Sequence, residues 1–393
     1  MNQDTSPLPH ETPLRIALLA HNLHTAGGAT VGRNVIASFT RMFPQHRFLF
    51  VVPAGADYER VCNSHSGSSL LLCNSRGILR RFVFDMYVLP RAIRAFHPDV
   101  VLALGNFGMS APPCPQAVFV HQPHLVYPDK HYGPRTIRDR FRHRYLKSRF
   151  ARQLENSALL FCQTEVMAKR LRSVYNFPGD IVVCGSSASP SGLPDSSCEA
   201  DDTFESYRNR FKIVYVARYY PHKNIESLVD LSHRYPEELR DVVTFITIDP
   251  NQHPNAARIL KRIVRLGLQD RVINLGALPH STVATYLRRC DALIMPTFLE
   301  TFGLPYVEAM KVGLPILTSD LDFAHEVCGD AALYFDPWNI ESMKEEILRL
   351  KSDDGLRHRL SENAKQRAIQ SFPSWDKIVG QMMEYLLLLP KNL

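Results

Sequence analysis

The sequence has no apolar run that approaches the roughly 18–20 residues a helix needs to cross a bilayer. Its first residues, MNQDTSPLPHETP, are polar and proline-rich and lack the apolar core of a secretory signal. We therefore expect a cytoplasmic protein, whose only contact with a membrane would be peripheral, at the inner face.

Paired cysteines are also missing. None of the eight cysteines belongs to a C-x-x-C pair, which argues against zinc sites and redox motifs. Several lie within apolar runs, so we predict reduced, mostly buried thiols rather than a disulfide framework. The eight are Cys62, Cys73, Cys114, Cys162, Cys184, Cys198, Cys290 and Cys328.

Signatures of nucleic-acid binding are lacking as well. The chain contains no zinc-finger spacing, no aromatic-basic ribonucleoprotein motif and no basic-leucine-zipper pattern. The formal charge of +7 and the pI near 9.0 nevertheless indicate anionic partners. A nucleoside diphosphate and a phospholipid surface remain as candidates, and we expect no nucleic-acid partner.

What the sequence does contain is a regular alternation of short β-branched runs and helix-period segments, which is typical of parallel sheets built from βαβ units. The length of 393 residues fits two domains. One series of predicted strands starts at Leu14, Arg47, Asp99, Gln116 and Ala158, and a second starts at Lys212, Val242, Arg271, Asp291 and Leu314. We predict an α/β protein with two Rossmann-like parallel-sheet domains that face each other across a cleft.

A stretch rich in Ser, Gly and Pro, CGSSASPSGLPDSSCEADD, separates the two series and is predicted to be the interdomain linker or a surface loop beside it. The predicted domains are residues 1–200, residues 201–374, and a C-terminal helix over residues 375–393 that could pack on either domain. Ligands of open parallel sheets bind beyond the carboxyl ends of the strands, so functional residues are expected on the loops that follow strands.

The most informative stretch is FLETFGLPYVEAMKVGLPILTSD, which follows the predicted strand DALIMP. Gly303 permits a close backbone approach, and Leu304 and Pro305 suit the first turn of a helix. The start of a helix presents N–H groups without partners to an anion. We therefore predict that the backbone of Phe302, Gly303 and Leu304 binds a diphosphate.

Glu300 and Glu308 flank this helix start. Eight positions of helix would advance about 12 Å and turn the two side chains about 80° apart, so they cannot act as a close carboxylate pair on one atom. The sequence therefore predicts separate roles for them. Two carboxylates on a helix surface are the alternative for a bare E-x7-E pattern, and Gly303 together with the preceding strand favours a functional site.

Three further loops follow predicted strands. Arg218 and Lys223 lie in VARYYPHKN, where cations would favour a leaving group that gains negative charge. Gly27 and Gly28 lie in HNLHTAGG and would let backbone amides approach a phosphate or a sugar. His121 ends the strand in FVHQ. The alternatives are a solvated turn for the loop of Arg218 and Lys223, a tight turn for the glycine pair, and a structural role for His121.

Together these motifs resemble the retaining glycosyltransferases of family 4, which have the GT-B fold and an E-x7-E signature. The resemblance implies that Glu300 lies near the donor sugar, that Glu308 binds the nucleotide ribose, and that Arg218 and Lys223 bind the donor phosphates. It also implies that Gly27 and Gly28 face the donor diphosphate, and that His121 lies near the donor sugar as a second catalytic residue. Neither a metal nor another cofactor is expected.

Two other features have competing interpretations. Asp320 and Asp322 form a D-x-D, which another glycosyltransferase fold uses for a divalent metal, but here we expect an ordinary loop and helix. The stretch from Arg135 to Arg152 carries seven arginines and one lysine against one aspartate, with an apolar i, i+4 row. It fits a peripheral contact with an anionic membrane, and equally a solvated basic helix.

The resemblance thus implies an enzyme that transfers a hexose or deoxyhexose, of mannose or rhamnose type, from a nucleoside-diphosphate sugar to an acceptor hydroxyl with retention. The acceptor that the resemblance implies is a carbohydrate or a lipid-linked glycan of cell-envelope polysaccharide or glycolipid synthesis. A sugar-nucleotide epimerase or phosphorylase of the same fold, and a catalytically silent relative, remain as alternatives.

Overall fold

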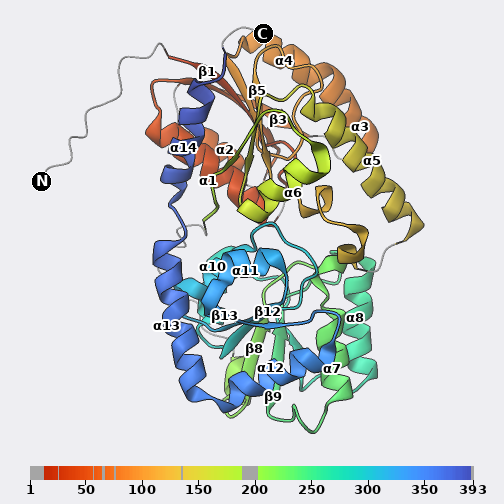
Figure 1. Ribbon diagram of the computed structural model, residues 1–393. Helices are drawn as coiled ribbons and strands as arrows, with labels where there is room; N and C mark the ends of the chain where they lie inside the picture. Colours follow the sequence, from red (N-terminus) through yellow and green to blue (C-terminus); the bar gives the residue numbers. More distant parts are fainter. Residues whose placement is uncertain are drawn as a thin grey trace, which may run out of the picture.

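The computed structural model describes residues 13–24, 26–55, 57–63, 67–74, 77–133, 136–187 and 202–390. It contains two parallel sheets, each covered by helices on both faces, in two domains stacked along the long axis of the molecule (Figure 1). The predicted α/β class with two Rossmann-like domains is confirmed. The predicted boundary at residues 200 and 201 lies outside the described residues, as does most of the predicted linker.

The N-terminal sheet has seven strands in the order β3-β2-β1-β4-β5-β6-β7, and all neighbours pair in parallel. Its strands are β1 (Arg15–Leu19), β2 (Arg47–Pro53), β3 (Ser68–Cys73), β4 (Val100–Ala103), β5 (Gln116–Val120), β6 (Leu159–Cys162) and β7 (Asp180–Val183). Its helices are α1 (Ala26–Met42), α2 (Tyr58–Cys62), α3 (Ile78–Val83), the π-helix η1 (Phe84–Val88), α4 (Leu89–Phe96), α5 (Ile137–Leu154) and α6 (Glu165–Tyr175).

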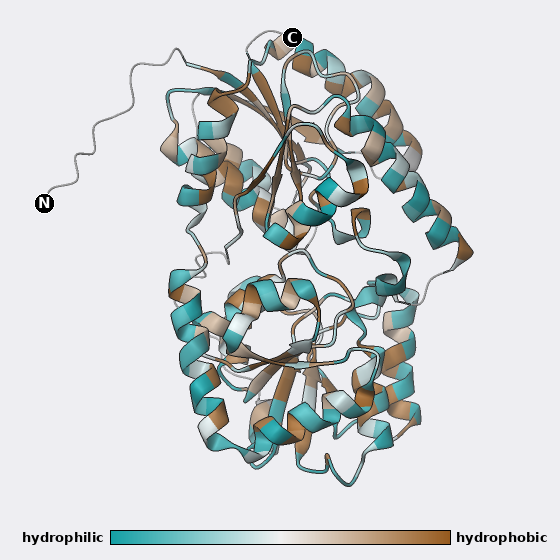
Figure 2. Cartoon of the chain, viewed as in Figure 1, coloured by the Kyte–Doolittle hydropathy of each residue, from teal (hydrophilic) through white to brown (hydrophobic). Residues whose placement is uncertain are grey.

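Alternate side chains of β1 enter the two cores of this domain. Ile16 and Leu18 pack in the core that contains α1, whereas Ala17 and Leu19 pack in the core beneath α4, α5 and α6. Both faces of the strand are buried, which explains the continuous apolar run in the sequence. The hydropathy colouring shows these apolar strands inside each domain (Figure 2).

The C-terminal sheet has the order β10-β9-β8-β11-β12-β13, again with parallel neighbours throughout. Its strands are β8 (Phe211–Tyr215), β9 (Val242–Ile246), β10 (Val272–Asn274), β11 (Ala292–Met295), β12 (Ile316–Ser319) and β13 (Ala332–Phe335). Its helices are α7 (Glu226–Arg234), α8 (Pro254–Arg265), α9 (Val283–Leu287), α10 (Leu304–Lys311), α11 (Asp322–Cys328), α12 (Ile340–Ser352) and α13 (Asp354–Gln370).

The last helix, α14 (Trp375–Leu387), crosses back to the N-terminal domain and packs beside α1 (Figure 1). Its apolar face, including Trp375, Val379 and Met382, is buried in the same core as β1. Arg41 of α1 forms an ion pair with Asp376 at the start of the helix. The apolar residues at helical spacing in the sequence are therefore core contacts.

The two domains touch directly through side chains of α11. Asp322 accepts a hydrogen bond from the Tyr127 hydroxyl at 3.0 Å and forms an ion pair with Arg170 of α6. The carboxylate of Glu326 accepts hydrogen bonds from the backbone N–H groups of Glu165 and Val166, at 2.5 and 2.7 Å. A residue of one domain thus satisfies the first turn of a helix in the other.

Among the described residues, no helix is long and apolar enough to cross a membrane. The seven described cysteines are free and buried, as predicted, and Cys198 lies outside the described residues.

Candidate functional site

The strand order of the C-terminal sheet places two of the sequence motifs side by side. β8 pairs with β11 in the middle of the sheet, where the order of strands reverses. At such a point the loops that follow the two strands diverge and leave a crevice beyond their carboxyl ends. The loop after β8 carries Arg218 and Lys223, and the loop after β11 carries Glu300 and leads into α10.

α10 begins with an anion-binding geometry. Its N-cap residue, Gly303, has a φ of 77°, and a Cβ atom at this position would lie 2.6 Å from the ring of Tyr306. Only glycine fits this backbone. Within the described part of the chain, the backbone N–H groups of Phe302, Gly303 and Leu304 donate no hydrogen bond. These three donors lie at the positive end of a helix dipole, where an anion is favoured.

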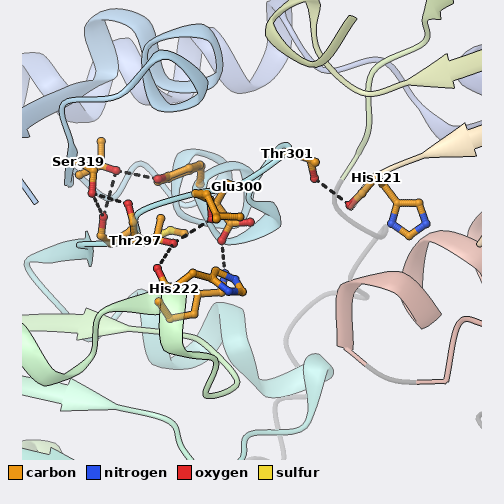
Figure 3. Close-up of polar contacts among 11 residues, drawn as sticks. His121, His222, Thr297, Glu300, Thr301 and Ser319 are labelled. Atoms are coloured by element: carbon orange, nitrogen blue, oxygen red, sulfur yellow. Dashed lines mark hydrogen bonds and ion pairs between the residues drawn. The ribbon is translucent and has the colours of Figure 1, made fainter. Parts of the chain in front are cut away.

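Lys223 and Glu300 form an ion pair across the crevice, and their side chains are only 14% and 12% exposed. Thr297 holds the two loops together, because its hydroxyl donates to the backbone oxygen of His222 at 3.0 Å. Ser319 of β12 donates in turn to the backbone oxygen of Thr297 at 2.7 Å. Figure 3 shows Glu300 surrounded by this network. The carboxylate and the ammonium are therefore fixed in position.

Arg218 contrasts with Lys223. It is half-buried on the loop after β8, and its side chain has no ion pair or hydrogen bond with any other residue that the structure describes. A half-buried guanidinium without a counter-charge is costly unless an anion pairs with it. Arg218 is thus available to an anionic ligand.

Glu308 lies on α10 and has a partner of its own. His280 Nε2 is 3.0 Å from Glu308 Oε1, and this hydrogen bond raises the pKa of His280 because the carboxylate favours the charged imidazole. The helix begins only at Leu304, so the predicted helical spacing across residues 300–308 was wrong for its first half. Glu300 lies on the preceding loop, and the two glutamates contact different residues.

The N-terminal domain contributes a second wall. A Cβ atom at Gly27 would lie 3.5 Å from Leu304 Cδ1, so the glycine pair of α1 faces the start of α10 across the domain boundary. A Cβ atom at Gly28 would lie 3.8 Å from the ring of His121. The hydroxyl of Thr301 donates to the backbone oxygen of His121 at 3.2 Å. The structure therefore brings residues from the N-terminal motifs to the C-terminal site.

His121 is held with its ring turned toward its own domain, away from Glu300 (Figure 3). Its Nε2 lies 2.8 Å from the backbone oxygen of Leu104, which can only accept, so Nε2 carries a hydrogen. Burial lowers the pKa of His121. A neutral ring in this tautomer leaves the lone pair on Nδ1.

The two aspartates of the D-x-D have partners within the protein. Asp320 Oδ1 is 2.6 Å from His325 Nε2, and Asp322 joins the two domains through Tyr127 and Arg170. Asp322 is the first residue of α11, which agrees with the loop and helix expected there. No cluster of His, Cys, Asp or Glu suited to a metal ion occurs among the described residues.

Three residues of the site were not predicted from the sequence. Thr297 and Thr301 form hydrogen bonds to loops, and His280 contacts Glu308. None belongs to a spaced motif, and only the strand-end position of Thr297 and Thr301 gave a signal.

Two family models match the chain, one in each domain. The model described as Glycosyltransferase Family 4 matches residues 27–185, and that described as Glycosyl transferases group 1 matches residues 199–367. The chain belongs to the group 1 and family 4 glycosyltransferases.

Relatives of this family member include two proteins of O-antigen synthesis. The O-antigen chain mannosyltransferase B of Escherichia coli is 26% identical over 63% of this chain and 65% of its own length. The O-antigen chain mannosyltransferase RfbU of Salmonella typhimurium is 24% identical over 48% of this chain and 51% of its own length. The matches thus span about half to two thirds of these relatives.

Solved structures confirm that this family member has the GT-B fold. Sucrose-phosphate synthase from Thermosynechococcus elongatus is 18% identical, with a TM-score of 0.71 over 95% of this chain and 98% of its own. WaaG, a glycosyltransferase of lipopolysaccharide biosynthesis, is 17% identical, with a TM-score of 0.71 over 94% and 99% of the two chains. Anabaena HepE in complex with UDP-glucose is 16% identical, with a TM-score of 0.72 over 96% and 100%.

Proposed function

We propose that the protein is a retaining glycosyltransferase that moves a hexose or deoxyhexose from a nucleoside-diphosphate sugar to an acceptor hydroxyl. Family membership supports group transfer, and the names of the two O-antigen relatives support a mannose-type donor and a role in cell-envelope polysaccharide or glycolipid synthesis. Its partners would be the nucleotide sugar, a carbohydrate or lipid-linked glycan acceptor and, through residues 135–152, the membrane surface.

The observation that carries the proposal is that backbone N–H donors without partners and a guanidinium without a counter-charge, among the described residues, follow two adjacent strands. Phe302, Gly303 and Leu304 offer backbone N–H groups without partners, among the described residues, at the start of α10. Arg218 lies on the loop after the adjacent strand β8 and has no counter-charge among the described residues. A diphosphate supplies charge and acceptors for both, and each charge-assisted hydrogen bond contributes about 1.5–3 kcal/mol.

The remaining predicted residues would act around this diphosphate. Lys223 would hold the phosphate and the Glu300 carboxylate together, and Glu300 would then lie beside the donor sugar. Glu308 would accept hydrogen bonds from the ribose, in competition with His280. Gly27 and Gly28 would face the diphosphate from the other domain. His121 would lie near the sugar, with its neutral ring as a hydrogen-bond partner rather than a charge.

The transfer itself would be a substitution on the front face of the sugar. The bond from the anomeric carbon to the phosphate oxygen breaks, the acceptor oxygen bonds to the same face of that carbon, and its proton passes to the departing phosphate oxygen. Lys223 and Arg218 favour this step, because negative charge grows on the phosphate as the bond breaks. Glu300 is held by Lys223, and Glu308 contacts His280, so neither is arranged with the other as a pair for double displacement.

We also propose that the reaction needs no divalent metal. The carboxylates of the D-x-D interact with His325 and with Arg170. The diphosphate would instead be bound by Arg218, Lys223 and the N–H groups at the start of α10. Positive charge from the protein would then replace that of an ion.

A thermal-shift panel tests the donor site. GDP, UDP, dTDP and ADP are added separately, with and without EDTA, and a ligand stabilises the folded state by RT ln(1 + [L]/Kd). One nucleoside diphosphate should raise the melting temperature well above the others, and EDTA should not change that shift. An unchanged melting temperature with all four nucleotides would contradict a nucleotide site, and a shift abolished by EDTA would contradict metal independence.

Product analysis then separates transfer from isomerisation and from double displacement. Conversion of a donor sugar without any acceptor would indicate an epimerase and contradict the proposal. A covalent sugar adduct trapped on a side chain would contradict the front-face mechanism while leaving transfer intact.

A further inference from the structure

His21 is a buried titratable residue that the proposed transfer leaves without a role. It follows β1 at the carboxyl end of the strand. β1 pairs with both β2 and β4, and the order of strands reverses between β1 and β4. In open parallel sheets, ligands bind at this point. His21 therefore lies in the N-terminal domain where Arg218 lies in the C-terminal domain.

Asp85 of η1 holds one edge of the His21 ring. Asp85 Oδ1 lies 3.5 Å from His21 Nε2 and accepts a hydrogen bond from Arg81 Nε at 2.9 Å. Arg81 donates in turn to the backbone oxygen of His21 at 3.2 Å. The other carboxylate oxygen, Oδ2, lies 3.5 Å from Arg149 of α5. This network ties the ring, the loop after β1 and α3 together.

The arrangement determines which ring nitrogen carries the hydrogen. A carboxylate oxygen can only accept, so Nε2 of His21 carries it and Nδ1 keeps its lone pair. Burial lowers the pKa of His21, against the opposing effect of Asp85, so the ring is neutral near pH 7. Nδ1 is buried and has no hydrogen-bond partner among the described residues. A buried acceptor without a partner is costly, and a donor brought by a ligand would remove that cost.

The loops after β1, β4 and β5 lie side by side beyond the sheet. A Cβ atom at Gly105, which follows β4, would lie 2.6 Å from Asn22 Cβ, so the loops after β1 and β4 are in contact. Asn106 Oδ1 accepts from the backbone N–H of His121 at 2.7 Å and joins the loops after β4 and β5. Neighbouring strands are about 4.8 Å apart, so β1 and β5 are about 10 Å apart. This separation is of the size of one sugar residue.

The same row of loops leads to the proposed donor site. The backbone oxygen of His121 accepts from the hydroxyl of Thr301, the neighbour of Glu300, at 3.2 Å. β5 thus carries the histidine that is expected near the donor sugar, and β1 lies two strands beyond it. His21 therefore lies where the acceptor, rather than the donor, would be bound.

We propose that His21 binds a hydroxyl group of the acceptor through Nδ1, and that Asp85 positions the ring for this contact. The inference rests on the proposed glycosyl transfer and names the acceptor at this position as a sugar. No bond forms or breaks at His21, because the hydroxyl only donates a hydrogen bond and the proton lost in transfer still passes to the departing phosphate oxygen. An acceptor that lacks this hydroxyl would leave Nδ1 unpaired and would be rejected.

A purely structural role is the alternative, and the fold offers a histidine of that kind. His46 precedes β2, at the opposite end of the same sheet, and is as buried as His21. Its Nδ1 accepts from the backbone N–H of Leu14 at 3.0 Å, so this nitrogen is used within the protein. His46→Phe is therefore the matched control for His21→Phe, because each variant keeps a ring and loses both nitrogens.

Transfer kinetics of the full-length protein test the proposal. Methyl α-D-mannopyranoside serves as the acceptor, with GDP-mannose as the donor, or dTDP-rhamnose if the thermal-shift panel selects dTDP. Hydrolysis of the donor by water is measured beside transfer. His21→Phe should raise the KM for the glycoside about three- to tenfold, since one hydrogen bond is lost, and leave hydrolysis unchanged. An acceptor KM equal to that of wild type would overturn the proposal.

Two variants check the lone pair and the orientation of the ring. His21→Asn keeps an acceptor atom two bonds from Cβ, as Nδ1 is, and should recover much of the affinity for the glycoside. Asp85→Ala removes the partner of Nε2, so the ring hydrogen can move to Nδ1 and the acceptor KM should rise as in His21→Phe. His46→Phe should lower the melting temperature and leave the acceptor KM unchanged. If His46→Phe raised this KM equally, the effect would be structural and the proposal would fail.

Monodeoxy analogues of the glycoside identify the hydroxyl that is bound. One analogue should be a poorer acceptor than the parent for wild type but no poorer for His21→Phe, because the same hydrogen bond is missing in both cases. If the losses from the substitution and from each deoxygenation were additive for every analogue, the hydroxyl contact would be refuted.

A spectroscopic titration does not depend on turnover. In protein labelled with ¹⁵N-histidine, the Nδ1 resonance of His21 is assigned by its absence in His21→Phe. Addition of the glycoside to the protein saturated with the nucleoside diphosphate should shift this resonance, and an unchanged resonance would overturn the proposal. Stabilisation by the nucleoside diphosphate should be the same in wild type and variants. Its absence in wild type would contradict the proposed function, whereas its presence without any response at His21 would contradict only this inference.

Discussion

At the scale of single residues, the proposed donor site would depend on a few positions whose backbone or charge has no substitute. Gly303 adopts a φ of 77° at the N-cap of α10 and leaves no room for a Cβ atom beside Tyr306. Lys223 and Glu300 neutralise each other in a nearly buried position. Arg218, in contrast, lacks a partner among the described residues. The site thus joins a rigid ion pair to a free cation.

Gly303→Ala should damage both stability and ligand binding. The new Cβ atom would lie 2.6 Å from the Tyr306 ring, so the loop or the ring must move, at a cost of about 1–3 kcal/mol. The N–H groups of Phe302 and Leu304 would shift with the loop. We expect a lower melting temperature and at least tenfold weaker affinity for the nucleoside diphosphate, measured by thermal unfolding and by titration.

Gly267→Ala is the matched control. Gly267 has a φ of 66°, but no atom lies within 4 Å of its added Cβ. This variant should lose about 1–2 kcal/mol of stability from the backbone conformation alone and keep its affinity. Wild-type affinity in Gly303→Ala would show that the start of α10 does not bind the diphosphate.

At the scale of helices and strands, the sequence predicted the regular parts well. All ten predicted strands occur, because each except the short, partly buried edge strand β10 is an apolar run that is largely buried on both faces of its sheet. β3, β7 and β13 were not predicted. All three lie at the edge of a sheet, and none of them is buried along its whole length.

The candidate site could be predicted only where its residues belong to a sequence motif. Spaced patterns after strands contain Arg218, Lys223, Glu300 and Gly303, and the structure brings them together at the carboxyl ends of β8 and β11. His280 lies in a loop that the sheet order alone brings to Glu308. The exposed apolar residues between Leu79 and Val88 follow a helical period, but periodicity indicates an apolar face without saying whether another element covers it.

Glu326→Ala tests how one helix holds the two domains together. The Glu326 carboxylate of α11 accepts from two backbone N–H groups at the start of α6, and such caps contribute about 0.5–2 kcal/mol. Without it the domains should separate more readily, which would raise the radius of gyration measured by small-angle X-ray scattering. Glu345→Ala, at an exposed position of α12, should leave the scattering unchanged. Identical curves for wild type and Glu326→Ala would refute this role.

At the scale of the whole molecule, the two domains supply different parts of the candidate site. The C-terminal domain holds the cations and helix N–H groups of the proposed donor site, whereas the N-terminal domain supplies the glycine pair of α1 and His121. α14 and the contacts of α11 tie the two domains together. A nucleotide held by one domain would thus meet an acceptor presented by the other.

The most direct measurement is a calorimetric titration, in the presence of EDTA, of the nucleoside diphosphate selected by the thermal-shift panel. Arg218→Ala should raise the dissociation constant about ten- to a hundredfold, since a charge-assisted contact of about 1.5–3 kcal/mol is lost. Arg265→Ala, which removes an exposed guanidinium from α8, should leave the constant unchanged. An Arg218→Ala protein that binds as tightly as wild type, or a wild type that binds only when EDTA is omitted, would contradict a metal-free diphosphate site between β8 and β11.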